Sequence, residues 1–177
     1  DLTPTLSLVR RGGIKYEIIR NKNNDGFAKG NNDGMKKAIK EGYDYLLSLE
    51  QDVIPPKDVI ERLLSHEKDI ISGVYYTIKE KALRPLLVVK KGENLHYLDS
   101  EKLLAYKDLF EVVICGLGCV LISSKVLSLA SFRYTKENKS FDDFWFCKDA
   151  IDKKFKIYAD PSVLFNHLFL MRPWKWR

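Results

Sequence analysis

Apolar runs with strand character alternate with stretches of helical period along this chain. The segments YDYLLSL at residues 43–49 and DIISGVYY at residues 69–76 have the apolar and aromatic content of buried strands. Elements in alternating order pack as a sheet that helices cover, so we predict an α/β fold with a mixed, mostly parallel central sheet flanked by helices. The expected strands are residues 15–20, 43–49, 69–76, 84–89, 112–122, 155–158 and 163–167, and the expected helices are residues 31–41, 55–64, 125–129 and 141–153.

Size and composition point to one soluble globular domain. With 177 residues, 45% of them apolar and 12% aromatic, the chain can bury one substantial core. No apolar run approaches the roughly 18–20 residues of a membrane span, and the N-terminus has no basic segment followed by an apolar one. We therefore expect a single domain over residues 1–177 and a cytoplasmic location. The final residues 172–177 (RPWKWR) suit a peripheral contact with a membrane surface, a disordered end or a cover over a binding cleft.

Cysteine content and net charge narrow the class of protein further. The three cysteines, Cys115, Cys119 and Cys147, are an odd number, which argues against a secreted disulfide framework. We expect small buried thiols, with an approach of Cys115 to Cys119 as the alternative. The net charge of +6 favours a polyanionic partner. The phosphates of a nucleotide, a nucleic acid and an anionic membrane surface are the three alternatives, and charge alone does not choose among them.

A segment rich in glycine and asparagine, NDGFAKGNNDG at residues 24–34, joins an expected strand to an expected helix. Glycine lets the backbone turn sharply and approach a ligand, and Asn31 is placed to cap the following helix, whose N-terminal amides favour an anion. The pattern indicates a nucleotide-binding wall that includes Gly26, Asn31 and Asn32, and an ordinary strand-to-helix turn is the alternative. The segment lacks the Lys-Ser/Thr ending of a Walker loop, so ATPase chemistry is not indicated.

Carboxylates stand at the end of the apolar strand that leads into Glu50-Gln51-Asp52. Alternation places Glu50 and Asp52 on the same side of the strand, at the edge where open α/β sheets bind ligands. A hard divalent cation that keeps several waters needs only one or two protein carboxylates together with phosphate oxygens. The alternative is that these acids simply end the strand.

Further candidate groups lie nearer the C-terminus. Asp142 and Asp143 open an amphipathic helix, where adjacent residues point about 100° apart, so only one of them aims fully into a cleft. Their alternative role is electrostatic stabilisation of the helix N-terminus. His167 ends the apolar run VLFNH, where a histidine is either a ligand or a hydrogen-bonded core residue. His66 and His96 have no such partners in the sequence, and we expect them to be structural or solvated.

Five segments carry these candidates in a fixed order. They are GFAKGNNDG with its following helix, YDYLLSLEQDVIPPKDVIERLL, DIISGVYY, ICGLGCVLISSKVL and SFDDFWFCKDAIDKKFKIYADPSVLFNH, which together cover roughly residues 20–168. In this order and spacing they resemble the family 2 group of GT-A-fold glycosyltransferases. The resemblance implies a GT-A domain that moves a sugar from a nucleotide-diphosphate donor to an acceptor hydroxyl, with inversion at the anomeric carbon.

The resemblance also implies roles for individual residues. Glu50-Gln51-Asp52 would be the aspartate-any-aspartate motif that meets the donor, and His167 a further ligand of the metal or the diphosphate. Asp52 and His167 would hold the divalent metal, Mn²⁺ or Mg²⁺. Asp143 would be the catalytic base and Asp142 an acceptor contact or helix cap.

Two glycines and a tryptophan complete the expected sugar pocket. Gly116 and Gly118 leave room for the backbone to pass close to a bound sugar, or else form a bulge or tight bend. Trp145 is either an acceptor-side wall or a core residue.

Two features depart from the family pattern. The motif opens with Glu50 rather than aspartate, which leaves its ribose contact open. The family's first strand and the acid at the end of its second strand are not evident before Lys15. Either part of the usual N-terminus is lacking, or residues 1–13 (DLTPTLSLVRRGG) form the first helix of a shortened domain.

Two other classes of protein stay open. A nucleotidyltransferase on a similar scaffold also needs carboxylates and a metal, but it usually carries a glycine-rich basic loop at its N-terminus, which this sequence lacks. A non-catalytic module that binds nucleic acid would account for the charge, yet its cations should cluster with exposed aromatics, and most lysines here are scattered. We therefore expect a nucleotide-sugar donor, a glycan, lipid or protein acceptor, and no nucleic-acid partner.

Overall fold

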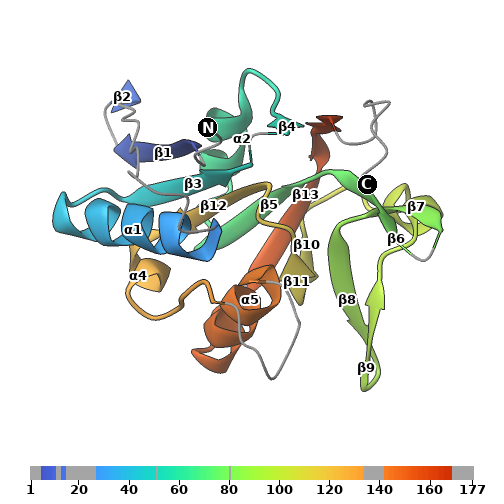
Figure 1. Ribbon diagram of the computed structural model, residues 1–177. Coiled ribbons are helices and arrows are strands. Elements are labelled where there is room, and N and C mark those ends of the chain that lie inside the picture. The colour runs from blue at the N-terminus through green and yellow to red at the C-terminus, as the bar shows by residue number, and fades with distance from the viewer. Residues whose placement is uncertain are drawn as a thin grey trace, which may run out of the picture.

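The computed structural model describes residues 5–10, 13–14, 27–50, 52–79, 81–133 and 142–168. Its centre is a seven-stranded sheet (Figure 1). The strands lie in the order β10 (Phe110–Val112), β13 (Ile157–Leu164), β5 (Ile70–Val74), β12 (Cys119–Ser123), β3 (Tyr45–Leu49), β1 (Thr5–Arg10) and β2 (Gly13–Ile14).

Helices cover both faces of this sheet. Helices α1 (Phe27–Lys40), α4 (Ser124–Leu127) and α5 (Asp142–Asp152) pack on one face, and α2 (Val59–Ser65) packs on the other (Figure 1). Successive strand residues point to opposite faces, so Leu46 joins the core under α1 and α5 while Leu47 joins the core under α2. The sheet therefore divides two apolar cores, which explains why its strands are apolar on both faces.

Most strand pairs in the sheet are antiparallel. Among the described strands, β13 and β5 form the parallel pair, whereas β12 runs antiparallel to both β5 and β3. The prediction of a mostly parallel sheet is therefore wrong, although the α/β class and the flanking helices are confirmed. An apolar run shows that a strand is buried but not which way it runs, and β12 enters the sheet between two strands that precede it in sequence.

Residues 5–10 and 13–14 form strands, so the alternative in which residues 1–13 form a first helix is wrong for the described residues. Strand β1 pairs antiparallel with β3 from Thr5↔Leu49 to Val9↔Tyr45, and it turns back into β2. The first four residues of this segment, TLSL at residues 5–8, alternate polar and apolar with the period of a strand, which explains the difference. The predicted strand at residues 15–20 and the tail at residues 172–177 lie outside the described residues.

The predicted start of helix α2 is wrong, whereas the predicted helix at residues 141–153 is confirmed. The prolines Pro55 and Pro56 lead into α2 rather than begin it, because the helix starts only at Val59, whose amide donates to the Pro56 carbonyl at 3.2 Å. The expected helix over residues 141–153 is confirmed as α5.

All three cysteines are buried free thiols, as predicted. None of the described helices is long and apolar enough to cross a membrane.

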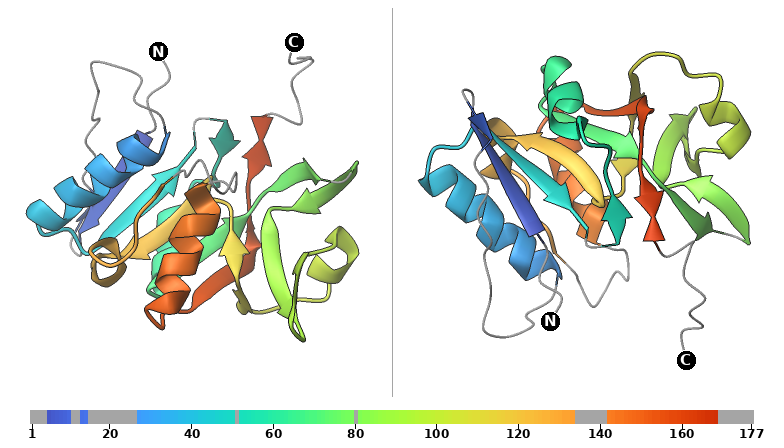
Figure 2. Two further views of the ribbon diagram at one scale, coloured as in Figure 1. Left: turned by 60° about the horizontal axis from the view of Figure 1, so that its bottom comes forward. Right: turned by 90° about the horizontal axis from the view of Figure 1, so that it is seen from above.

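A group of short strands stands beside the central sheet (Figure 2). The chain passes from β5 into a hairpin and then into a three-stranded sheet of order β11-β8-β9. Near it, β4 pairs antiparallel with β14. The prediction of one extended segment at residues 84–89 did not identify β9 or the short helix that follows it. These side elements are β4 (Val53–Ile54), β6 (Tyr76–Lys79), β7 (Ala82–Pro85), β8 (Leu87–Lys91), β9 (Asn94–Tyr97), α3 (Ser100–Leu103), β11 (Ile114–Cys115) and β14 (Asn166–His167).

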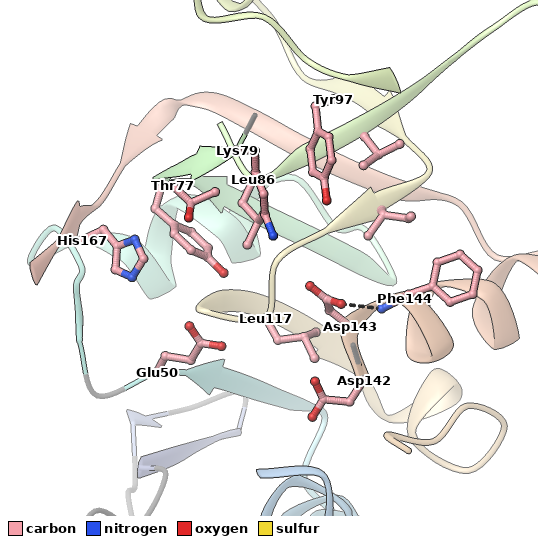
Figure 3. Close-up of a pocket in the computed structure, with 13 residues that line it drawn as sticks. Glu50, Thr77, Lys79, Leu86, Tyr97, Leu117, Asp142, Asp143, Phe144 and His167 are labelled. Atoms are coloured by element: carbon pink, nitrogen blue, oxygen red, sulfur yellow. Dashed lines mark hydrogen bonds between the residues drawn. The ribbon is translucent and has the colours of Figure 1, made fainter. Parts of the chain in front are cut away.

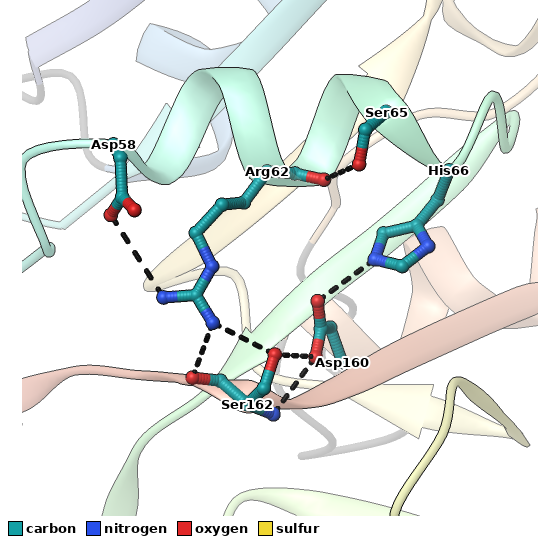
Figure 4. A network of polar contacts seen from close by, with 6 residues as sticks. All are labelled: Asp58, Arg62, Ser65, His66, Asp160 and Ser162. Carbon is teal, nitrogen blue, oxygen red and sulfur yellow. Dashed lines mark hydrogen bonds and ion pairs between the residues drawn. The ribbon is translucent and has the colours of Figure 1, made fainter.

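A polar network between α2 and β13 holds an irregular point of the sheet (Figure 4). The register of β13 against β5 shifts beyond Ala159. There, Asp160 lies 2.8 Å from Nε2 of His66 and accepts hydrogen bonds from the amide and hydroxyl of Ser162. Arg62 donates to the carbonyl and hydroxyl oxygens of Ser162 at 2.7 and 2.8 Å. The network fixes the strand that leads into β14, and His66 is structural, as predicted.

Candidate active site

A pocket of about 300 Å³ lies where β3 ends, between α5 and the side strands (Figure 3). Acidic side chains from β3 and α5 line one side, and aliphatic and aromatic side chains from the side strands line the other. The pocket therefore draws on three separate parts of the fold. Its lining comprises Glu50, Tyr75, Thr77, Lys79, Leu86, Val88, Tyr97, Ile114, Leu117, Asp142, Asp143, Phe144 and His167.

Asp142 and Asp143 begin α5 and both line the pocket. Burial raises the pKa of Asp143 to about 6 and outweighs the hydrogen bond that it accepts from the Phe144 amide at 2.7 Å. The charge of Asp142 raises this pKa further, whereas the Lys79 ammonium lowers it. Burial also raises the pKa of Asp142. A carboxylate with a pKa near neutrality at the wall of a pocket has the property that a general base needs.

Glu50 follows the last residue of β3, and its carboxylate points into the pocket (Figure 3). Burial raises the pKa of Glu50 to about 7, and the charges of Asp52, Asp143 and Asp142 act in the same direction. The three aspartates therefore lie close enough to Glu50 for their charges to oppose its ionisation. Such a concentration of negative charge favours a bound cation or a shared proton.

Asp52 and His167 are brought together by the pairing of β4 with β14. His167 pairs with Val53, and the Leu168 amide donates to the Asp52 carbonyl at 2.7 Å. Nδ1 of His167 lies 2.7 Å from the Tyr76 carbonyl, which can only accept, so Nδ1 carries a proton and the lone pair of the neutral form of the ring is on Nε2. Nε2 lies 3.4 Å from Oδ2 of Asp52.

Two bases that face each other in this way fit a divalent metal ion. Within the described part of the chain, no group of three or more histidine, cysteine or acidic side chains forms a complete protein cage for a metal. A cation held by Asp52 and His167 would therefore need phosphate oxygens and water to fill its coordination, which is the arrangement that Mg²⁺ adopts with phosphate ligands.

The asparagines predicted to form a nucleotide wall make contacts within the protein. Helix α1 begins at Phe27, so Asn31 lies inside the helix and the prediction that it caps the helix is wrong. Asn31 is fully buried, with its side-chain oxygen 3.4 Å from the Ser48 hydroxyl. Asn32 donates to the Phe132 carbonyl at 2.7 Å and accepts from the Phe132 amide at 3.0 Å. These contacts hold α1 against β3 and against the segment after α4.

The remaining predicted residues have several locations. Gly26 and Gln51 lie outside the described residues. Gly116 and Gly118 flank Leu117, which lines the pocket, but the glycines themselves face Tyr75. Their role in binding a sugar stays a prediction.

Trp145 lies one residue beyond the part of α5 that lines the pocket. The Arg133 guanidinium lies 4.8 Å from its ring centroid, and the Phe144 ring packs edge-on against it. Its Nε1 is buried without a hydrogen-bond partner among the described residues. The acceptor wall predicted for Trp145 stays a prediction.

Sequence reasoning missed Lys79 and Tyr97. Their side chains reach toward Asp143 from the opposite side of the pocket (Figure 3), with Nζ of Lys79 5.9 Å from the Tyr97 ring centroid. Each comes from a short hairpin strand without a motif. Strand alternation places Thr77 and Lys79 on the same side of β6, and this signal could have identified Lys79.

An α/β domain with an acid-lined pocket at a strand end has the form of a GT-A-fold glycosyltransferase. Residues 5–128 match the family model described as glycosyl transferase family 2, and the chain belongs to this family. The resemblance seen in the sequence is thereby confirmed, and with it glycosyl transfer as the family's activity. The match ends before α5, so Asp142, Asp143 and His167 lie beyond it.

Comparison with solved structures supports the same fold. The crystal structure of A197 from STIV aligns with a TM-score of 0.54 and 19% sequence identity, over 81% of this chain and 68% of that chain. At this identity the likeness concerns the fold alone. No curated protein matches the sequence.

Proposed function

We propose that the chain transfers a sugar from a nucleoside-diphosphate donor to an acceptor hydroxyl, with inversion at the anomeric carbon. The observation that carries the proposal is the meeting of Glu50, Asp143 and His167 in one pocket. They come from the end of β3, the start of α5 and the C-terminal β14, which lie far apart in the sequence. In a member of glycosyl transferase family 2, this convergence supports a site with a leaving-group end and a proton-accepting end.

The leaving-group end is the pair of Asp52 and His167. These residues would hold Mn²⁺ or Mg²⁺, which neutralises the charge that grows on a departing diphosphate. The Tyr76 carbonyl fixes the His167 ring with its Nε2 turned toward Asp52. Glu50 lines the pocket together with His167, and its carboxylate can accept a hydrogen bond from a donor hydroxyl.

The proton-accepting end is Asp143. As the acceptor oxygen forms its bond to the anomeric carbon, Asp143 takes the hydroxyl proton, and the bond from that carbon to the diphosphate oxygen breaks on the opposite face. One displacement of this kind inverts the anomeric configuration. With a pKa of about 6, Asp143 is ionised at neutral pH and able to receive the proton. Asp142, which also lines the pocket, would contact the acceptor.

We assign the acceptor to the side of the pocket that the side strands form. Figure 3 shows Glu50 and Asp143 on one side of the pocket and Tyr97 with Lys79 on the other. An acceptor lying against Tyr97 therefore presents its hydroxyl to Asp143. Aliphatic residues such as Val88 and Ile114 give this side an apolar surface.

A panel of nucleotide sugars tests the proposal. Each is added with and without Mn²⁺, and the melting temperature and the release of nucleoside diphosphate are both measured. We expect one donor to raise the melting temperature of the wild-type protein with Mn²⁺ and to release its nucleoside diphosphate. Asp143→Asn should still bind this donor but should no longer release nucleoside diphosphate from it. Absence of binding by any nucleotide sugar, together with salt-sensitive nucleic-acid binding, would instead favour a basic binding module.

A further inference from the structure

Tyr75 lies where the chain passes from β5 into β6. The residue is only 3% exposed and belongs to the pocket lining. Its hydroxyl oxygen accepts a hydrogen bond from the Gly118 amide at 3.0 Å. The Gly118 carbonyl in turn accepts a hydrogen bond from the Glu50 amide at 3.1 Å. Tyr75 is thus linked through one residue to the strand end that carries Glu50.

The two glycines beside Leu117 leave room for the Tyr75 ring. Neither is among the residues with positive φ, so the backbone conformation does not require glycine there. A Cβ atom on Gly116 would lie 2.1 Å from the Tyr75 hydroxyl oxygen, and one on Gly118 would lie 2.6 Å from its Cζ. The turn that brings Leu117 into the pocket therefore closes over Tyr75 because both flanking residues lack side chains.

The Tyr75 ring also contacts His167. The two ring centroids are 5.3 Å apart and the ring planes meet at 84°, which is an edge-to-face arrangement. The next residue, Tyr76, accepts the hydrogen bond from His167 Nδ1 through its carbonyl. Consecutive residues therefore set both the position of the His167 ring and its tautomer.

We propose that Tyr75 is a positioning residue that fixes Glu50 and His167 relative to each other across the pocket. Its importance for turnover rests on the proposed function, which gives those two residues their place at the donor. The hydroxyl acts on Glu50 through Gly118, and the ring acts on His167. Burial, followed by the charge of Glu50, raises the pKa of Tyr75 well above its ordinary value, so the hydroxyl stays neutral.

Two substitutions separate these contacts. Tyr75→Phe removes the hydroxyl and keeps the ring, whereas Tyr75→Leu removes both. Tyr43→Phe is the matched control, because Tyr43 is also 3% exposed but lies in the core under α1, away from the pocket. Donor turnover is measured together with nitrogen NMR spectra of the imidazole rings, which the chain's three histidines keep simple.

We expect Tyr75→Phe to lower kcat about tenfold or more, because a displaced strand end moves Glu50 out of place, and to keep His167 in its Nδ1–H tautomer. Tyr75→Leu removes the ring that holds His167 against the Tyr76 carbonyl. It should therefore also give tautomer-averaged His167 signals and weaken their broadening by added Mn²⁺. The signals of His66 and His96 should not change. The Tyr43→Phe control should alter neither turnover nor the His167 signals.

The inference is overturned if Tyr75→Phe turns over donor as fast as Tyr43→Phe, or if Tyr75→Leu leaves the His167 spectrum unchanged. Failure of the proposed function has a different signature. In that case the wild-type protein releases no nucleoside diphosphate from any nucleotide sugar, while the histidine spectra still decide whether Tyr75 sets the position of His167.

Discussion

At the scale of single residues, the pocket is marked by carboxylates whose ionisation opposes folding. The pKa of Glu50 is raised to about 7 and that of Asp143 to about 6, in each case mainly by burial. Groups with raised pKa values in a pocket are candidates for function, because a fold selected only for stability would replace them. Transfer and stability should therefore respond in opposite directions when one of them is neutralised.

Asp143→Asn should abolish most transfer and stabilise the protein. The amide is nearly isosteric but cannot take a proton, so turnover should fall about 10²–10⁴-fold with little change in donor affinity. The folded-state pKa of Asp143 lies above its unfolded value, so the stability cost is complete above about pH 6 and fades as the pH falls toward 4. Urea unfolding should show a gain of at most about 3 kcal/mol at pH 8 and almost none at pH 4.

Asp142→Asn is the control for the base assignment and should reduce transfer less. If Asp142→Asn were crippled while Asp143→Asn stayed near wild type, the base would have to move by one residue. If both variants kept wild-type turnover, the carboxylate account would fail.

The rate of sugar transfer should fall at acid pH. Glu50 and Asp143 must be ionised to act, so the acid limb should lie between about pH 6 and about pH 7 and belong to both groups together. Lys79 lowers the pKa of Asp143, so Lys79→Met should move the limb to higher pH. The exposed Lys81 lies near the end of the same hairpin, and Lys81→Met should leave the profile unchanged. If Lys79→Met leaves the acid limb at the same pH, Asp143 is not the group that accepts the proton in the rate-determining step.

At the scale of elements, strands and helices that carry their own pattern could be predicted, and their contacts across the fold could not. The run YDYLLSL shows a buried strand, and the acids at its end are visible in the sequence. In contrast, the local pattern assigns Asn32 to a nucleotide-binding wall, because its partner Phe132 lies far along the chain and cannot be identified from that pattern. The direction of β12 likewise depends on which strands it pairs with.

The network between α2 and β13 should be sensitive to acid. Burial alone would raise the pKa of Asp160, but hydrogen bonds from Ser162 and His66 outweigh it and lower the pKa below its ordinary value. This stabilisation is therefore present above the unfolded pKa of about 4 and is lost as the pH falls through the lower folded value. Asp160→Asn should cost about 1–3 kcal/mol in urea unfolding at pH 7, and the difference should shrink in acid.

Asp58→Asn is the control for this network. Asp58 lies 3.9 Å from Arg62 with its side chain 63% exposed, so its loss should cost less than about 0.5 kcal/mol. Equal costs for the two substitutions would show that the buried contacts of Asp160 do not hold β13.

At the scale of the whole molecule, the end of β3 and the start of α5 supply the acidic side of the pocket, and the side strands supply the opposite side. The acids and the histidine could be predicted because strand ends and helix starts mark them in the sequence. Lys79 and Tyr97 could not, because each is a single residue in a short hairpin and reaches the pocket only through the way the hairpins fold beside the sheet. Under the proposed function, the donor contacts lie at the end of β3 and at the β4–β14 pair, and the acceptor contacts lie on the hairpin strands β6, β8 and β9.

The central claim is that Asp52 and His167 hold a metal that binds the donor diphosphate. Calorimetric titration with the nucleoside diphosphate of the active donor, with Mn²⁺ and with a chelator, tests it most directly. We predict at least about tenfold stronger binding with Mn²⁺, a difference of about 1.4 kcal/mol, and loss of that gain in Asp52→Asn. Equal affinity with Mn²⁺ and with the chelator would contradict the account.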